Sequence, residues 1–321
     1  SKGGSFVKWY GNIDYALRLA DLWDDSKTNA SVRRGDVNAY FKQCIGWSQM
    51  GGGNEKNFSI LSQCVCGTAT PTILRNDTVY TKYVLGFLNT KIPPLYIKAF
   101  NPLLSTYIGD ICNLPFIVDE ASKERVEVIV DSNIELAKDD WDSFETSWDF
   151  KKHPFIRPVA TIKEAYEQWE QECNDRRAKL KANEEELNRI FIEIYGLQDE
   201  LTPEVDDKDI TVRAADLQRD MRSFVSYAVG CMFGRYSLDR EGLVFAGGDF
   251  DRVYWKHKGQ APLDENGEVP FGGGYAGVSI ATYNYPRFWN DTQNWENTPC
   301  LRFAPDADNC LPITEEHLFE D

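Results

Sequence analysis

The feature that most restricts the fold is a long amphipathic segment between Thr161 and Gly196. Thr161-Ile-Lys-Glu164 fits a capping box, in which Thr161 accepts a backbone N–H and Glu164 reaches back toward the start of the helix. Gly196 stands where a left-handed turn would end the helix. About 35 residues at ~1.5 Å each predict a rod roughly 50 Å long, which favours a spacer or packing strut over a ligand site. The apolar stripe consists of Ile162, Tyr166, Trp169, Cys173, Leu180, Leu187, Phe191 and Ile194, with Arg176, Asn183 and Glu184 where it is interrupted.

A second amphipathic helix is expected from about Val212 to Phe233. Gly230 within it indicates a close backbone approach. Beyond Arg235 the sequence changes to short aromatic runs separated by glycine-rich turns, such as residues 271–277. This pattern predicts a loop-rich end of the chain. The apolar stripe of the second helix is Leu217, Met221, Phe224, Val225, Ala228 and Met232.

The first part of the chain mixes both kinds of secondary structure. Residues 59–74, SILSQCVCGTATPTIL, predict strands with turns. Residues 80–92 predict a short helix that Pro93-Pro94 ends. Residues 125–158 are expected to begin as a strand and to continue as an extended acidic, aromatic connector.

Together these segments predict an α+β protein, with a mixed first lobe, a long helical spacer and a mixed, loop-rich C-terminal lobe. A chain of 321 residues is long enough for two or three packed units, since a single core stops growing near roughly 250–300 residues. The expected ranges are 1–118 for the first lobe, 119–160 for a connector, 161–236 for the helical spacer and 237–321 for the C-terminal lobe.

Charge is distributed unevenly along the chain. The formal net charge is −16, which at first argues against a nucleic-acid partner. Residues 1–118, however, hold 12 Lys and Arg against 8 Asp and Glu, whereas the remaining residues hold 23 against 43. The first lobe therefore permits contact with DNA, and the acidic remainder suggests a surface turned away from phosphates or a protein-docking face.

Several classes of protein are disfavoured by composition. No apolar run approaches the ~18 residues that span a bilayer, so we expect no membrane partner. Eight scattered cysteines, among which only Cys64 and Cys66 are close, predict reduced thiols in a cytoplasmic protein and no zinc site. The chain begins with Ser1 and ends in an acidic stretch, and we expect it to be a segment of a longer protein.

No local motif predicts an active site. GGGYAG at 272–277 has the spacing of a dinucleotide fingerprint but lacks the preceding strand and the following helix, so we interpret it as a turn. Asn113-Leu-Pro-Phe116 differs from the Asn-Pro-Pro-Tyr/Phe tetrapeptide of amino-methylating enzymes by Leu114, and no glycine-rich donor element precedes it. We therefore expect no catalytic residue and no metal in this segment.

The opening stretch KGGSFVKWYGN, residues 2–12, combines cations, glycines and aromatic rings. Such a mixture suits a surface that touches phosphates and bases. Gly3 and Gly4 would let the backbone approach a phosphate. If the segment is extended, Trp9 and Tyr10 alternate faces, so that at most one of them faces DNA. The alternative is a glycine-punctuated strand whose aromatic residues belong to the core. The candidate DNA-binding residues here are Lys2, Gly3, Gly4, Lys8, Trp9 and Tyr10.

Several longer stretches resemble one family. They are KGGSFVKWYGN, YFKQCIGWSQMGGGN (40–54), LGFLNTKI, GDICNLPF, DWDSFETSWDFKKHP, EEELNRIFIEIYGLQDELTPEV and SFVSYAVGCMFGRYSLDREGL. These stretches resemble the target-recognition portion of PglX-type adenine-specific DNA methyltransferases of bacteriophage-exclusion (BREX) systems and their type II restriction-modification relatives. The resemblance runs in order from residue 2 to about residue 243, and the C-terminal FAPDADNCLPITEEHLFED also fits.

The resemblance implies that this segment reads a DNA target sequence and is not catalytic by itself. The family's active site and its S-adenosylmethionine would belong to a separate, preceding domain, and no cofactor is expected in this segment. The implied partners are double-stranded DNA, the methyltransferase domain of the same protein and other phage-defence proteins. Further candidate contacts are Arg33, Arg34, Lys42, Trp47, Ser48, Gln49 and Asn54, while the alternative for Tyr40, Phe41, Ile45 and Trp47 is a place in the core.

Two rival functions stay open at the level of sequence. The acidic surface and the long helix also suit an interaction scaffold within a phage-defence complex. The aromatic content, with 9 Trp, 15 Tyr and 18 Phe, suits a glycan-binding module, although no export signal accompanies it. DNA binding that weakens steeply with salt would distinguish DNA target recognition from both rival functions.

Overall fold

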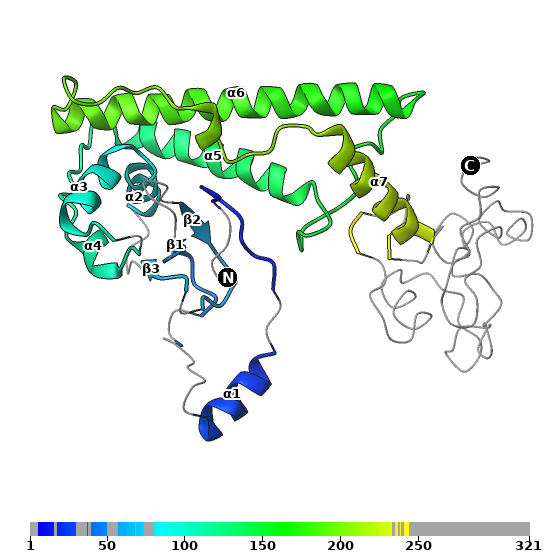
Figure 1. Cartoon of the computed structure of the whole chain (residues 1–321), viewed down its shortest axis with the longest axis horizontal. Helices are drawn as coiled ribbons and strands as arrows, with labels where there is room; N and C mark the ends of the chain where they lie inside the picture. Colours follow the sequence, from blue (N-terminus) through cyan, green and yellow to red (C-terminus); the bar gives the residue numbers. More distant parts are fainter. Residues whose placement is uncertain are drawn as a thin grey trace, which may run out of the picture. The chain divides into compact units, whose positions relative to one another are not determined.

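The computed structural model divides the chain into two compact units (Figure 1). Unit 1 comprises Ser1–Asp142, Thr146–Trp148 and Glu167–Ala215, and unit 2 comprises Ser143–Glu145, Asp149–Tyr166 and Asp216–Asp321. We describe each unit by itself. The structure describes residues 6–15, 18–29, 37, 40–49, 57–67, 69–73, 80–103, 105–232, 235–236, 238 and 241–243.

The elements confirm a mixed α+β protein. Three short strands are β1 (Cys44–Trp47), β2 (Phe58–Leu61) and β3 (Thr72–Ile73). The α-helices are α1 (Leu19–Thr28), α2 (Thr81–Leu88), α3 (Ile92–Phe100), α4 (Ile108–Cys112), α5 (Lys123–Asp142), α6 (Ile162–Tyr195) and α7 (Leu217–Met232), and a 3₁₀ turn, η2, covers Asp207–Asp209. Among the described residues, no helix combines the length and the apolar character that crossing a membrane requires.

The sheet of unit 1 has the order β2-β1-β3 and is antiparallel throughout. Cys44 lies opposite Leu61 and Trp47 opposite Phe58, while Ile45 lies opposite both Ile60 and Ile73. Every residue of β1 and β2 is buried, because helices cover the sheet and β3 and the N-terminal segment flank it. The predicted strands within 59–74 are thus confirmed.

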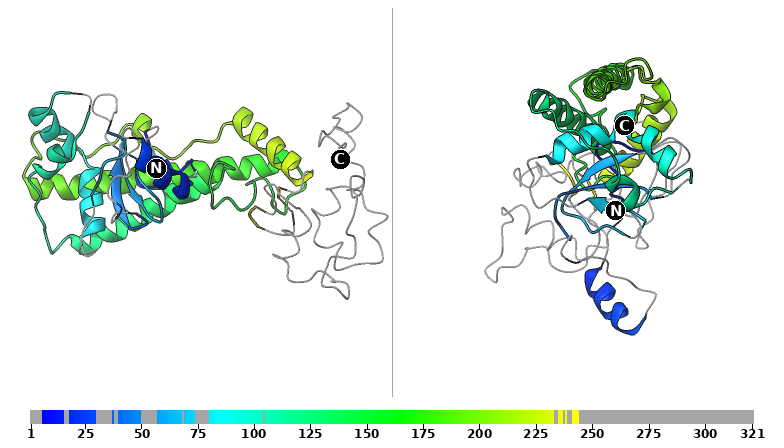
Figure 2. Two further views of the ribbon diagram at one scale, coloured as in Figure 1. Left: turned by 90° about the horizontal axis from the view of Figure 1, so that it is seen from below. Right: turned by 90° about the vertical axis from the view of Figure 1, so that its left-hand side faces the viewer.

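Helix α2 lies between the sheet and the long helices. It contacts β1 and β2 on one side and α5 on the other. A Cβ added to Gly86 of α2 would lie 2.9 Å from Val130 and 3.0 Å from Val126, both on α5. The amide of Asn183 on α6 donates to Asn133 on α5 at 2.8 Å, and these two helices run alongside each other (Figures 1 and 2). The core of unit 1 is therefore a sheet, a short helix and two long helices in contact.

The segment predicted to be a strand followed by an extended connector is instead the 20-residue helix α5. The alternation in Arg-Val-Glu-Val-Ile-Val resembles a strand, so the strand prediction was wrong. Val126, Val130, Asn133, Ala137 and Asp140 are buried at steps of three and four, which place them on one helical face. Burial of this face, with Val126 and Val130 against α2, outweighs the weak β preference of valine and isoleucine.

Both ends of α6 lie where the sequence predicted them. The hydroxyl of Thr161 accepts the N–H of Glu164 at 3.2 Å, and the carboxylate of Glu164 accepts the N–H of Ala160 at 3.0 Å, one residue earlier than an ideal capping box. Gly196 adopts φ +65°, and the N–H of Leu197 reaches the carbonyl of Ile192 at 3.0 Å. The left-handed turn predicted at Gly196 is confirmed.

Other boundaries differ in detail from the prediction. Helix α2 ends at Leu88, and Pro93-Pro94 lie in the first turn of α3, where a missing N–H costs nothing. Helix α7 begins at Leu217 rather than near Val212, whose carbonyl accepts the Arg177 guanidinium at 2.7 Å. The predicted domain ranges stay predictions. Most of 237–321 lies outside the described residues.

Unit 2 is built around a cluster of rings. Phe150, Tyr227 and Tyr236 are buried with Cys231, and a Cβ added to Gly230 would lie 2.7 Å from the Tyr236 ring, which confirms the close approach predicted there. His153 is 2% exposed, and its Nδ1 accepts the N–H of Phe155 at 3.2 Å. Burial lowers the pKa of His153 to about 4, although the charge of Asp220 opposes the shift. The imidazole is therefore neutral at pH 7.

We predict that Gly86→Val destabilises unit 1 by about 1–3 kcal/mol, because the added atoms collide with Val126 and Val130 and force α2 away from α5. Gly109→Ala in α4 is the matched control, since no atom lies within 4 Å of its added Cβ. Urea unfolding followed by circular dichroism measures both variants. Equal stability of Gly86→Val and the wild type would contradict this packing.

We predict that unit 2 loses stability as pH falls from about 6.5 to about 4, because the unfolded His153 takes up a proton before the folded one does. A shift of this size corresponds to on the order of 3 kcal/mol over the whole interval. His153→Asn keeps an acceptor for Phe155 and does not titrate. Denaturant unfolding at pH 7 and pH 4.5 should show a smaller pH effect in this variant, and an identical pH effect in both proteins would refute the assignment.

Candidate nucleic-acid interface

Lys8 and Trp9 lie inside the protein. The Lys8 ammonium is 2.7 Å from Oε2 of Glu184, and the Trp9 indole N–H donates to Oε1 of the same carboxylate at 2.8 Å. Trp9 is fully buried, and the Lys8 side chain is 9% exposed. Neither side chain faces solvent in this structure, so we interpret both as structural residues.

Backbone bonds fix the same segment to the sheet. The N–H of Trp9 donates to the carbonyl of Phe58 at 2.9 Å, and the carbonyl of Trp9 accepts the N–H of Ile60 at 2.9 Å. Trp9 thus forms a parallel bridge with Ser59 at the outer side of β2, and its φ of +70° turns the chain there. The structure supports the alternative interpretation of the opening stretch, in which it is a strand-like segment whose Trp9 ring lies in the core.

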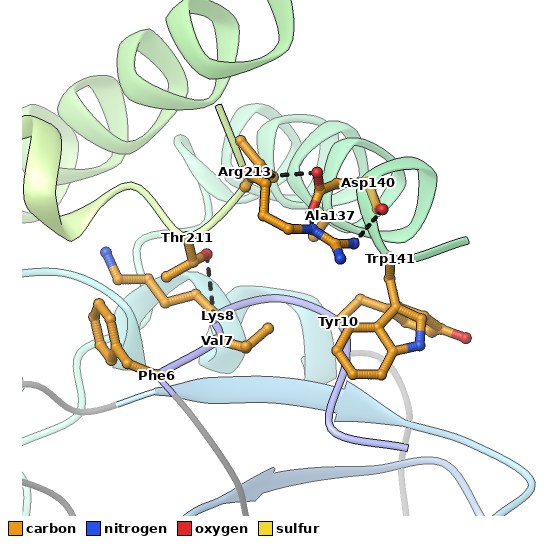
Figure 3. Close-up of a pocket in the computed structure, with 10 residues that line it drawn as sticks. Phe6, Val7, Lys8, Tyr10, Ala137, Asp140, Trp141, Thr211 and Arg213 are labelled. Carbon is orange, nitrogen blue, oxygen red and sulfur yellow. Dashed lines mark hydrogen bonds and ion pairs between the residues drawn. The ribbon is translucent and has the colours of Figure 1, made fainter. Parts of the chain in front are cut away.

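Tyr10 and a pocket lie beside this anchor. Tyr10 is partly exposed, with the Lys138 ammonium 5.0 Å from the centre of its ring. It lines a pocket of about 250 Å³ together with residues from the end of α5 and from the segment after η2 (Figure 3). The lining residues are Phe6, Val7, Lys8, Tyr10, Ala137, Asp140, Trp141, Thr211, Val212 and Arg213.

An ion pair forms one wall of the pocket. Arg213 donates from Nε to Asp140 at 2.9 Å and from its backbone N–H to the same carboxylate at 3.2 Å. Burial raises the pKa of Asp140, while the charges of Arg213 and Arg176 oppose the shift. Because Lys8 is likewise bound to Glu184, each cation of the pocket faces a carboxylate.

Lys42 is exposed just before β1. It follows Phe41, which one alternative of the sequence analysis placed in the core. Phe41 is 55% exposed and adopts φ +61°, an uncommon conformation for a bulky residue. Its N–H donates to the carbonyl of Cys64 at 3.1 Å, and its ring contacts the Tyr40 ring edge to face at 6.3 Å between centroids. A fixed turn thus presents a ring and a cation together.

Trp47, Ser48 and Gln49 lie at the other end of β1. Trp47 is 2% exposed, its indole N–H donates to the carbonyl of Thr106 at 3.0 Å, and its ring packs on Phe58, so the core alternative holds for it. Ser48 and Gln49 are partly exposed. The backbone of Gln49 is held by Ala69 and Thr106, which fixes where its side chain begins.

Six predicted contacts cannot be placed. Lys2, Gly3, Gly4, Arg33, Arg34 and Asn54 lie outside the described residues. Of the predicted set, the structure therefore leaves Tyr10, Lys42, Ser48 and Gln49 at the surface, and it adds Phe41. The exposure of Phe41 had no clear local signal, since Phe41 lies between the aromatic Tyr40 and the cationic Lys42 and either environment could have decided it.

Two side chains of the tetrapeptide Asn113–Phe116 contact the core of unit 1. Leu114 is 8% exposed, and the Phe116 ring contacts the rings of Tyr83 and Phe87 at 5.9 and 5.4 Å between centroids. The carbonyl of Pro115 accepts the hydroxyl of Tyr195. Phe116 is nevertheless 37% exposed, and Asn113 and Pro115 are exposed as well, so these contacts cover only part of the Phe116 ring. In the described part of the chain, no glycine-rich turn connects a strand directly to a helix.

Three of the described cysteines, Cys44, Cys64 and Cys66, lie close together near the Phe41–Lys42 turn. The Cys66 thiol lies within hydrogen-bonding distance of both Cys44 and Cys64, and the bond from Cys66 lowers the pKa of Cys44. All cysteines that the structure describes are free thiols. In the described part of the chain, no group of three or more His, Cys, Asp and Glu residues has the arrangement of a metal site.

Comparison with known proteins gives two relatives. The chain is 38% identical over 275 residues to the adenine-specific methyltransferase PglX of Lacticaseibacillus casei (strain Zhang), a match that covers 80% of this chain and 22% of the relative. It is 29% identical over 275 residues to the adenine-specific methyltransferase BrxX of Escherichia coli O9:H4 (strain HS), covering 77% of this chain and 21% of the relative. The chain thus spans about a fifth of the length of these relatives. No family model matches the chain.

We predict that Glu184→Gln destabilises unit 1 by about 3–5 kcal/mol, because it leaves the Lys8 ammonium buried without a counter-charge. Adding Lys8→Met to Glu184→Gln should restore much of the loss, since no charge then stays buried. Asp207→Asn, which removes an exposed partner of Lys181, is the control and should leave unfolding nearly unchanged. Chemical denaturation measures all three proteins, and equal effects of Glu184→Gln and Asp207→Asn would show that the buried pair is unimportant.

Proposed function

Because the chain belongs, over the stretch that it shares, to the family of PglX- and BrxX-type adenine-specific methyltransferases, we propose that it is the part of such an enzyme that recognises the DNA target sequence. It matches only about a fifth of each relative. Its one tetrapeptide of catalytic appearance, Asn113–Phe116, departs from the Asn-Pro-Pro-Tyr/Phe pattern at Leu114, which is buried. Methyl transfer, with its S-adenosylmethionine, is therefore assigned to parts of the enzyme other than this chain.

The observation that carries the proposal is the Phe41–Lys42 turn. A bulky residue at positive φ is energetically unfavourable and persists where surrounding structure imposes it, which happens often at functional sites. Here the turn exposes a large ring that could otherwise be buried, directly beside a cation. Lysine neutralises phosphates, and an exposed ring offers a face on which an unpaired base can stack.

Ser48 and Gln49 are proposed to contact base edges. Glutamine can form two hydrogen bonds to adenine in the major groove, and serine can bond to several bases. Residues that read bases must be held in register, and two backbone hydrogen bonds fix Gln49. Lys42 would then supply the sequence-independent contact and Ser48 with Gln49 the sequence-dependent ones.

A protein-interaction module is the second candidate, and one observation favours it. Phe100, Leu103 and Ile108, around the end of α3 and the start of α4, are between 50% and 67% exposed. Exposed apolar side chains this close together are typical of surfaces that bind other proteins, such as further components of a phage-defence system. This candidate predicts association that is insensitive to salt, whereas DNA recognition predicts the opposite.

We predict that the chain binds duplex DNA with an affinity that falls steeply between 50 and 200 mM salt. Lys42→Ala should reduce the slope of log affinity against log salt by about 0.9, the contribution of one phosphate contact. Phe41→Ala should weaken binding to a duplex with a single-stranded overhang roughly five- to hundredfold through lost stacking on an unpaired base, with little change in slope. Fluorescence anisotropy with a labelled duplex measures both quantities.

Lys152→Ala is the matched control for Lys42→Ala, since Lys152 is also an exposed lysine but belongs to unit 2. It should leave affinity and slope unchanged. An absence of duplex binding at low salt, or a Lys42→Ala protein indistinguishable from the Lys152→Ala protein, would count against the proposed function.

A further inference from the structure

The pocket beside Tyr10 has the size of a site for a single ring system. Its volume of about 250 Å³ lies just below the roughly 300–1,000 Å³ of pockets that hold drug-sized ligands. Figure 3 shows Phe6 at one end of the pocket and Tyr10 with Trp141 at the other. Flat rings at both ends and the small Ala137 in the lining favour a planar guest.

The electrostatics of the pocket favour an uncharged guest. The Arg213 guanidinium is bound to Asp140, and the Lys8 ammonium is bound to Glu184, so the two cations that line the pocket are already neutralised. A phosphate or another anion would have to compete with these carboxylates. A neutral ring with a hydrogen-bonding edge meets no such competition. The Thr211 hydroxyl accepts the backbone N–H of Lys8 at 3.3 Å and can donate its own proton to the edge of such a ring.

The pocket is accessible and close to the sheet. The Arg213 side chain is 30% exposed, and Tyr10 and Trp141 are partly exposed, which leaves the pocket open to the surface. Trp9 pairs with Ser59, and Ser59 lies opposite Gly46 of β1. The segment that lines the pocket is therefore two strand spacings, about 10 Å, from the strand that leads to Ser48 and Gln49.

We propose that this pocket receives a nucleobase extruded from DNA, stacked against the Tyr10 and Trp141 rings. The inference rests on the proposed function, since only a DNA-binding surface would present such a base. Extrusion costs unstacking energy, and this cost is smallest for a base that has no partner. Stacking on aromatic side chains returns about 1–3 kcal/mol per base.

The test compares a fully matched duplex with the same duplex carrying one bulged base. The wild-type chain should bind the bulged duplex roughly tenfold more tightly. Ala137→Leu, which fills the pocket, should abolish this preference and leave the affinity for matched duplex unchanged. Val128→Leu, at a 64% exposed position on the same helix, is the control and should behave as the wild type.

Trp141→Leu serves as a second variant if thermal unfolding shows that Ala137→Leu is not folded, and it should also lose the preference. Equal binding of both duplexes by the wild type would overturn the pocket proposal and leave the proposed function intact. A preference that survives both variants would overturn it as well, whereas failure to bind any duplex would refute the proposed function itself. Free adenosine or thymidine that binds the wild type but not Ala137→Leu, without a bulge preference, would assign the pocket to a soluble ring and overturn the proposal.

Discussion

The buried carboxylate of Glu184 is the interaction on which the arrangement of unit 1 depends. Its two oxygens bind Lys8 and Trp9, so one residue near the middle of α6 holds the N-terminal segment from 175 or more positions away. Both charges are removed from water, which is tolerable only because each is paired and hydrogen-bonded. The bond fixes where the chain enters the sheet, and with it the pocket that the same segment lines.

The rest of unit 1 connects the anchored N-terminal segment to the proposed DNA-binding surface. The anchored segment bridges to β2, β2 pairs with β1, and β1 ends in the two places where surface residues are held by backbone hydrogen bonds, Phe41–Lys42 and Ser48–Gln49. Helix α2 supports the sheet from behind, and its glycine at position 86 allows α5 to approach closely. A rigid scaffold that presents a few polar and aromatic side chains is what sequence recognition requires.

Local sequence signals predicted the parts of the fold that local physics controls. The Thr161 cap, the turn at Gly196 and the apolar stripe of α6 depend on neighbouring residues and were predicted, except that Ile162 of the stripe is exposed. Helix α5 was misassigned because valine-rich alternation is decided by what the segment packs against. The burial of Lys8 and Trp9 depends on Glu184, which is remote in sequence. The only sequence signal for this burial was the interruption of the apolar stripe at Glu184. That interruption does not indicate which residues Glu184 binds. Phe41 shows the same limit, since the bond to Cys64 that fixes its turn joins distant residues.

Photo-cross-linking to DNA tests the central claim most directly. A duplex carrying 5-iodouracil, mixed with the chain at low salt and irradiated, attaches to the aromatic side chains that lie against its bases, and peptide mass spectrometry locates them. If unit 1 reads DNA through the Phe41–Lys42 turn, the attached peptides should include residues 40–49, and the attachment should disappear at high salt. Cross-links confined to peptides of unit 2, or equal yields at low and high salt, would contradict the account.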